Sequence, residues 1–365
     1  MSSYENLSKK NSDKYQFVFP YYNYNRNILS GSFGALDFNS NGNNNLSNTN
    51  VLKTSVINNL SYTSNENIFN NLGIVSNFEL YIKNLNKIGK NDEIYTSNLK
   101  SEISSIYIVN SSIPYFKSTQ NSFETLIPKI SLRFNPGDML NYNNLDRNTN
   151  TSNIVSINRL GFDDTLESGK SLTFGIEYKH ENIDDENNFF KIDLATVFRD
   201  REEKNIPNKT TLNKKNSNLF GLFEYNFSEL LNLNYEFQLD NKFQTFELNN
   251  ISVNFNTSKF ATKIKFIEEN GLLGNTNLIE NNFTYKFDDK NNLTFQTRRN
   301  RTINLTEYYD IIYDYKNDCL AAGIKYKKTY YSDRELKPME DLMFFITIYP
   351  ITTFEQKIDQ DLYRN

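Results

Sequence analysis

The sequence has few of the residues on which disulfides, metal sites and catalytic triads depend. Its 365 residues include one cysteine, one histidine and no tryptophan. A single cysteine excludes a disulfide within the chain. Because His180 has no second histidine or cysteine near it, a zinc site and a histidine-based catalytic triad lack support. No glycine-rich phosphate loop occurs, so the sequence predicts no metal site, no cofactor and no enzymatic activity.

Long apolar runs and a large net charge are also missing. No segment approaches the roughly 18 apolar residues that a transmembrane helix needs, and residues 1–15 lack the apolar core of a signal peptide. The formal net charge of −4 is small for this length, which argues against a general surface for nucleic acids. The mean hydropathy is −0.65, so the chain is hydrophilic on average.

Aromatic residues and a strict alternation of apolar with polar residues are what the sequence does contain. It has 24 tyrosines and 29 phenylalanines, which favour strands. In residues 231–239, the apolar positions Leu231, Leu233, Tyr235, Phe237 and Leu239 alternate with Asn232, Asn234, Glu236 and Gln238. Residues 172–179 alternate in the same way. A period of two predicts strands with one apolar and one polar face.

About 17 such strands are expected, and no helical periodicity competes with them. They lie near residues 14–22, 32–40, 51–63, 70–84, 100–113, 122–134, 169–180, 187–198, 217–227, 231–240, 246–256, 259–269, 278–288, 291–301, 305–316, 319–331 and 340–350. The sequence therefore predicts an all-β, antiparallel fold in a single domain, residues 1–365.

The connections between these strands alternate in length. Short ones, such as 288–292 and 316–318, alternate with long ones, such as 135–168, 199–216 and 331–341. Short turns on one side and long loops on the other are typical of a transmembrane β-barrel in the bacterial outer membrane. A soluble β-sandwich would also alternate along its strands, but it would not need an apolar aromatic face on nearly every strand. We therefore predict a transmembrane β-barrel with 135–168 as a long external loop.

Four segments resemble one known family. They are "PKISLRFNPGDMLN" (128–141), "SINRLGFDDTLESGKSLTFGIEYK" (156–179), "TRRNRTINLTEYYDIIYDYKNDCLAAGIKYKKTYYSDRELKP" (297–338) and "LMFFITIYP" (342–350). These segments are similar to the outer-membrane lipopolysaccharide-assembly protein family, LptD, in its alphaproteobacterial branch. The Asn-Asp-Cys before the strand at 319–331 is the most specific part of the resemblance.

The resemblance implies a role in transport and no covalent chemistry. It implies that lipopolysaccharide enters the outer leaflet through a barrel lumen and a lateral seam, with the strand at 340–350 on one side of the seam. The implied partners are lipopolysaccharide, an LptE-like plug lipoprotein, a periplasmic bridge protein and the outer membrane. Relative to the family, we expect a partial barrel of about 16 to 18 strands, without the N-terminal jellyroll and first strands. The alternatives are a general diffusion porin or another outer-membrane barrel, and, with weak support, an outer-membrane phospholipase.

Three groups of residues are candidate sites. The first is a network that fixes the loop inside the barrel mouth, formed by Asn158, Arg159, Gly161, Asp163, Asp164, Glu167 and Gly169; a solvated loop is the equal alternative. By resemblance, Cys319 is expected to form a disulfide with a cysteine of an N-terminal region outside this sequence. Arg298, Arg299 and Arg301 are candidate contacts for lipopolysaccharide phosphates. The simpler interpretation of these arginines is pairing inside the lumen with Asp310 and Asp314.

Overall fold

One antiparallel sheet makes up the fold of this computed structural model. The structure describes residues 2–5, 15–47, 50–69, 73–330, 339–349 and 352–359. The strands are β1 (Ser2–Glu5), β2 (Tyr15–Gly31), β3 (Gly34–Ser47), β4 (Val51–Ser64), β5 (Asn67–Phe69), β6 (Ile74–Lys90), β7 (Lys100–Ser112), β8 (Tyr115–Ser118), β9 (Ser122–Asn135), β10 (Gly169–Asn182), β11 (Phe189–Arg199), β12 (Leu219–Phe227), β13 (Leu231–Leu239), β14 (Phe246–Asn256), β15 (Phe260–Glu269), β16 (Thr276–Lys286), β17 (Asn291–Asn300), β18 (Leu305–Lys316), β19 (Leu320–Thr329), β20 (Met339–Ile348) and β21 (Thr352–Asp359).

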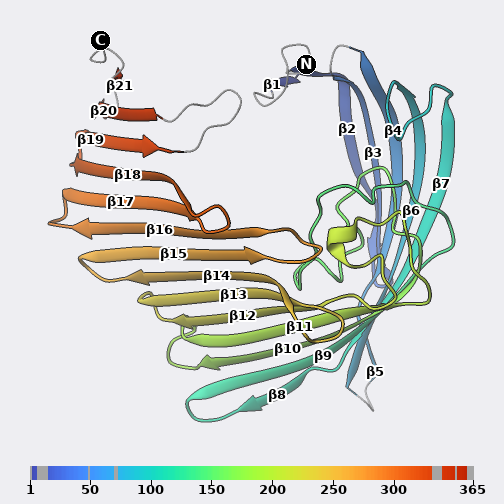
Figure 1. The fold of residues 1–365 in the computed structure, drawn as a ribbon. Coiled ribbons are helices and arrows are strands. Elements are labelled where there is room, and N and C mark those ends of the chain that lie inside the picture. The colour runs from blue at the N-terminus through green and yellow to red at the C-terminus, as the bar shows by residue number, and fades with distance from the viewer. Residues whose placement is uncertain are drawn as a thin grey trace.

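Each strand pairs with the next one along the chain, so the topology is a meander. The short strands β5 and β8 are the exceptions, because β4 pairs with β6 and β7 pairs with β9 past them. The sheet curves into a crescent that has a concave and a convex face (Figure 1). In the described residues β1 and β21 do not pair with each other, so the sheet stays open there.

The predicted all-β, antiparallel fold is confirmed. Each of the 17 predicted segments overlaps a strand, and 18 of the 21 strands are eight residues or longer. The one helix in the described part of the chain is the 3-10 turn η2 (Asn208–Thr210). No described helix has the length and apolar character needed to cross a membrane.

The last of the predicted strands is confirmed, but it is not the last strand of the sheet. The segment near 340–350 is β20, and β21 follows it and pairs along it. The sequence of β21 contains two apolar residues, Phe354 and Ile358, four positions apart, a spacing that fits a helix as well as a strand. The assignment of 135–168 to the external side does not change, because it follows from the lengths of the connections and not from the number of strands.

In soluble proteins apolar side chains are mostly buried and charged ones mostly exposed. Strands β9 and β10 show the reverse. Along the last part of β9, Leu132 and Phe134 point outward and are 53% and 40% exposed, whereas Arg133 is 4% exposed. In β10, Phe174 is 42% exposed and Thr173 is 2% exposed. On these two strands, apolar side chains are therefore accessible on the convex face, and the polar side chains between them are buried on the concave face.

The register of β13 shows the same division. Leu233 lies opposite Tyr225 and Val253, so apolar side chains meet across three strands. Asn234 lies opposite Glu224 and Ser252, and its amide donates a hydrogen bond to Glu224 Oε1 at 3.2 Å. Cross-strand pairs of like polarity hold the register, because a slip of one residue would exchange the two faces.

The long connections gather at one end of the sheet. We call this end the long-loop rim; it carries residues 91–99, 136–168 and 200–218. The opposite end, the short-turn rim, carries 228–230, 257–259 and 287–290. Figure 1 shows that the loops 136–168 and 200–218 do not extend away from the sheet but occupy the space inside its curve.

Candidate functional site on the concave face

A buried ion pair lies at the centre of the loop 136–168. Arg159 donates from Nε to Glu167 Oε2 at 2.6 Å and from Nη2 to Glu167 Oε1 at 2.5 Å. The two side chains are 0% and 3% exposed. Arg159 also donates to the hydroxyls of Ser171 and Thr173 on β10, at 3.0 and 3.2 Å. This bidentate pair therefore joins the loop to the concave face of the strand that follows it.

Two further arginines bind the loop from the strands. Arg199, at the end of β11, donates to Glu167 Oε1 and to the carbonyl of Ser168. Arg133 of β9 donates to the carbonyls of Ser156 and Ile157 at 2.5 and 2.7 Å. Main-chain carbonyls of a loop that is buried away from water need such donors. Arginine supplies several donors from one side chain, which suits this position.

A second cluster surrounds Asp164. Its Oδ2 accepts hydrogen bonds from the hydroxyls of Tyr142 and Tyr95 at 2.6 and 2.7 Å, and it lies 3.3 Å from Lys53 Nζ. The Lys53 ammonium also lies 4.2 Å from the centre of the Tyr95 ring. Next to it, the main-chain carbonyl of Asp163 accepts a hydrogen bond from Lys83 of β6. The loop is thus also attached to the strands on the N-terminal side of the crescent.

Two carboxylates of the loop, those of Glu167 and Asp164, are held in their ionised form. Burial alone raises the pKa of Glu167, but the charge and hydrogen bonds of Arg159, with Arg199 and Arg133, outweigh burial and lower that pKa far below its ordinary 4.5. Burial opposes ionisation of Asp164 in the same way, yet the charge of Lys53 and the tyrosine hydroxyls lower its pKa. These are fixed charges at neutral pH, which suits a structural role.

An apolar cluster packs the two long loops against the strands. Its buried members are Met139, Tyr142, Ile154, Leu160, Phe162, Ala195, Val197, Ile206, Leu212 and Phe220. Tyr142 and Phe162 stack with their ring centres 4.3 Å apart. Ala195, Val197 and Phe220 come from the concave faces of β11 and β12. The loops are therefore held by packing as well as by charge, and they form a small core of their own.

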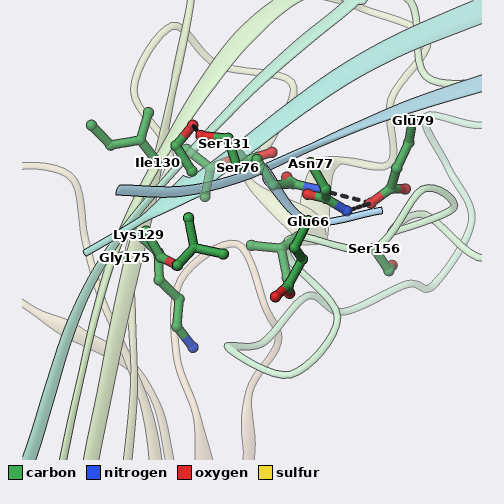
Figure 2. Close-up of a pocket in the computed structure, with 15 residues that line it drawn as sticks. Glu66, Ser76, Asn77, Glu79, Lys129, Ile130, Ser131, Ser156 and Gly175 are labelled. Carbon is green, nitrogen blue, oxygen red and sulfur yellow. Dashed lines mark hydrogen bonds between the residues drawn. The ribbon is translucent and has the colours of Figure 1, made fainter. Parts of the chain in front are cut away.

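A pocket of about 390 Å³ remains between the loop and strands β6, β7, β9 and β10. Figure 2 shows Glu66 between Lys129 on one side and Glu79 and Ser156 on the other. Glu79 Oε1 accepts hydrogen bonds from the amides of Asn110, at 2.8 Å, and Asn77, at 3.4 Å (Figure 2). The lining thus combines carboxylates, amides and one ammonium with apolar side chains such as Val75, Ile130 and Val155. No metal-binding group of three or more ligands occurs among the described residues.

The structure places the predicted loop residues as follows. Of the three predicted acidic residues, Glu167 pairs with Arg159 and Asp164 with Lys53. Asp163 contacts Lys83 through its main-chain carbonyl and not through its carboxylate. The amide of Asn158 closes a turn by donating to the carbonyl of Phe162 at 2.8 Å. Gly161 and Gly169 have positive φ angles of +70° and +84°, which glycine adopts without strain.

The strand residues that bind the loop were not predicted. They are Lys53, Lys83, Arg133 and Arg199, and Tyr95 of the connection 91–99 binds the loop with them. Arg133 had a signal in the sequence, because it stands between Leu132 and Phe134 at a polar-face position. No sequence pattern links any of these residues to its loop partner.

The three candidate arginines, at and just after the end of β17, do not lie at one site. Arg298 lies on the concave face, with Nε 2.8 Å from Glu307 Oε2 and 3.6 Å from Glu280 Oε1. Its partners are thus these glutamates and not the expected Asp310 and Asp314. Arg299, on the other face, donates to Asn304 Oδ1 at 2.7 Å. Arg301 is exposed in the turn that follows.

Cys319 lies in the tight turn before β19, at the short-turn rim. It is exposed, and its main-chain N–H donates to Asn317 Oδ1 at 2.9 Å. The lone His180, near the end of β10, lies 3.7 Å from Glu124. Neither residue belongs to the loop network.

Comparisons with known proteins find similarity only among solved structures. No protein-family model and no curated protein matches the chain. A mutant of the ferric enterobactin receptor of Pseudomonas aeruginosa aligns with a TM-score of 0.41 and 7% identity, over 96% of this chain and 64% of that one. The copper transporter OprC aligns with a TM-score of 0.39 and 7% identity, over 99% of this chain and 68% of that one.

The chain therefore spans less than two thirds of that receptor. At this identity and TM-score, the similarities assign no ligand, partner or activity to the chain.

Proposed function

We propose that the chain is the membrane-embedded part of an outer-membrane β-barrel transport protein. Its convex face would lie in lipid, and its concave face would line a polar passage. The observation that carries the proposal is the inverted burial of the sheet, in which Leu132 and Phe134 are exposed while Arg133 between them is buried. In water such a sheet would expose a wide apolar band to solvent, which is unfavourable. In a membrane the apolar face would contact lipid acyl chains, and the hydrogen bonds of the sheet would keep the main-chain N–H and C=O groups paired.

The test of membrane embedding compares two neighbouring residues. A photo-crosslinking side chain at Leu233 should react with phospholipid in vesicles that contain the protein. The same group at Asn234, on the opposite face, should not. Equal reaction with lipid tails at both positions would overturn the proposal.

We propose further that the passage serves lipopolysaccharide. The support is the resemblance of residues 128–141, 156–179, 297–338 and 342–350 to the LptD family, together with a concave face rich in asparagine that suits a sugar chain. In this proposal lipopolysaccharide leaves laterally into the outer leaflet, and Arg298 is the one candidate arginine on the concave face that could meet a phosphate. A plug lipoprotein and a periplasmic bridge protein would be the partners.

A diffusion channel is the second candidate function. The docked loops 136–168 and 200–218 favour it, because loops folded inside a barrel are a common way to narrow or plug its lumen. In that case small polar solutes would pass, and no lipid would be transported.

One experiment separates the two candidates. In cells that transport lipopolysaccharide, a photo-crosslinker at Asn234 should capture lipopolysaccharide if the chain belongs to a translocon. A diffusion channel would give no such product, and the protein in planar bilayers would conduct ions steadily. Steady conductance without any lipopolysaccharide adduct would refute the translocon proposal while leaving the membrane proposal intact.

A further inference from the structure

The convex face carries a groove beside the long-loop rim. It has a volume of about 590 Å³ and lies where β7, β9, β10 and β11 meet. β7 pairs with β9 only from Tyr107 to Ser112. β9 ends at Asn135, whereas β7 continues to Lys100. The extra length of β7 therefore forms a step next to the ends of β9 and β10, and the groove lies at that step.

The wall of the groove is apolar and aromatic. Its outward-facing side chains are Tyr107, Val109, Leu132, Phe134, Leu172 and Phe198. The rings of Tyr107 and Phe134 stack with centres 6.2 Å apart. Each of these two side chains is 40% exposed. The volume falls within the range of about 300–1,000 Å³ that is usual for ligand pockets, so the groove can hold one acyl chain.

Four charged residues line the groove. Arg133 and Arg199 point to the concave face, where they bind the docked loop, and are 4% and 7% exposed. Lys170 and Asp200 are thus the one positive and the one negative side chain at its mouth. Lys170 Nζ lies 5.3 Å from the centre of the Phe134 ring, which keeps the ammonium beside the apolar wall. Asp200 lines the same mouth from the end of β11. An ammonium is a binding point for a phosphate, and a carboxylate can accept a second ammonium. The two charges together match a headgroup that carries both signs.

We propose that this groove binds one membrane phospholipid with a phosphoethanolamine headgroup. The acyl chain lies along Tyr107, Leu132 and Phe198, the phosphate contacts Lys170, and the headgroup ammonium contacts Asp200. The proposal rests on the membrane embedding proposed above. It concerns the outer wall of the sheet and not the polar passage, so the lipid is a fixed component of the protein's surface and is not cargo.

The test is native mass spectrometry of protein extracted gently from vesicles of phosphatidylethanolamine and phosphatidylglycerol. The wild-type chain should retain one phosphatidylethanolamine. Lys170→Ala should lower its occupancy on the order of tenfold, because a hydrogen bond to a charged group is lost. Asp200→Ala should shift the preference toward phosphatidylglycerol.

Lys328→Ala is the matched control. Lys328 also lies beside an aromatic ring, 5.6 Å from the centre of Tyr330, but it pairs with Glu340 at 3.2 Å and lies outside the groove. The Lys328→Ala variant should retain phosphatidylethanolamine as the wild type does. Equal retention in the Lys170 and Lys328 variants, or a wild-type preference for phosphatidylglycerol, would overturn the proposal. Failure of every variant to insert into vesicles would instead refute the membrane embedding, which is measured in parallel by extraction at alkaline pH.

Discussion

Replacing Glu167 with glutamine tests whether the buried ion pair holds the loop 136–168 against the sheet. The substitution keeps the shape of the side chain but removes its charge. Arg159 and Arg199, which are 0% and 1% exposed, both bind this carboxylate. Removing one partner of a buried ion pair costs about 3–5 kcal/mol, because the remaining charge is left buried and uncompensated. Two guanidinium groups lose their partner here, so we expect a cost in the upper part of that range.

Hydrogen exchange of loop amides gives the measurement. If the loop opens locally, each 1.4 kcal/mol changes the opening equilibrium about tenfold, so a cost of about 4–5 kcal/mol should lower protection by roughly 700- to 4,000-fold. Suitable probes are the N–H of Gly161, which donates to the carbonyl of Asn158, and the N–H of Ile154, which donates to that of Asn150. Amides in the middle of β13 should keep their protection.

Asp146→Asn is the matched control in the same loop. Asp146 pairs with Lys209 at 3.0 Å, but its side chain is 75% exposed. Exposed pairs contribute about 0–1 kcal/mol, so this variant should exchange almost like the wild type. If Glu167→Gln and Asp146→Asn exchange alike, the buried pair does not hold the loop and the reasoning fails.

Acid should reproduce the effect of the substitution. The pKa of Glu167 is lowered in the folded protein, so its contribution to stability is complete above the ordinary pKa of 4.5 and declines as the pH falls below it. Loop exchange in the wild type, corrected for the intrinsic rate, should therefore be constant from neutral pH down to about pH 5 and rise in more acidic solution. Glu167→Gln should lack this part of the rise. A rise in the wild type that begins near neutral pH would contradict the assignment.

Three further predictions concern the sheet and its turns. Leu233→Arg should destabilise the protein in vesicles by about 2–4 kcal/mol at mid-membrane depth, whereas Asn234→Arg should cost much less; urea unfolding in vesicles measures both. A Cβ at Gly221 would collide with the ring of Phe237 on the next strand, so Gly221→Ala should cost about 1–3 kcal/mol in that assay, and Phe237→Ala should relieve the clash. If Cys319 is the linking cysteine that the family resemblance implies, a longer parent protein should migrate differently with and without reductant, and Cys319→Ser should remove that difference.

The strands could be predicted from the sequence because one pattern determines them. Alternation in 231–239 places Leu233 and Asn234 on opposite faces, and the register with β12 and β14 agrees with that placement. The strand β21 was missed because its segment has too few apolar residues to show a period. Short strands such as β5 and β8 were missed for the same reason.

The partners of the loop could not be predicted, because its contacts join residues far apart in the sequence. Asp164 meets Lys53, 111 residues earlier, and Tyr95, 69 residues earlier. The alternation predicts that a charged side chain on the polar face points inward. It does not predict which residue that side chain contacts. The charges at Arg159 and Glu167 were therefore predictable as a candidate network. Its division into two clusters depends on how the sheet curves, which local patterns do not encode.

The docked loops divide the concave face into two parts. Between β4 and β14, inward-facing side chains such as Arg133 and Gln238 bind the loops, so this part of the face is occupied. From β15 to β20 the inward side chains pair across strands instead, as Lys325 does with Asp310 at 3.2 Å and Arg298 with Glu307 at 2.8 Å. In the described residues no docked loop covers these pairs. We infer that a polar solute or sugar chain on the concave face would move along β15 to β20, and that Arg298 is therefore the better of the candidate arginines at which to look for a bound phosphate.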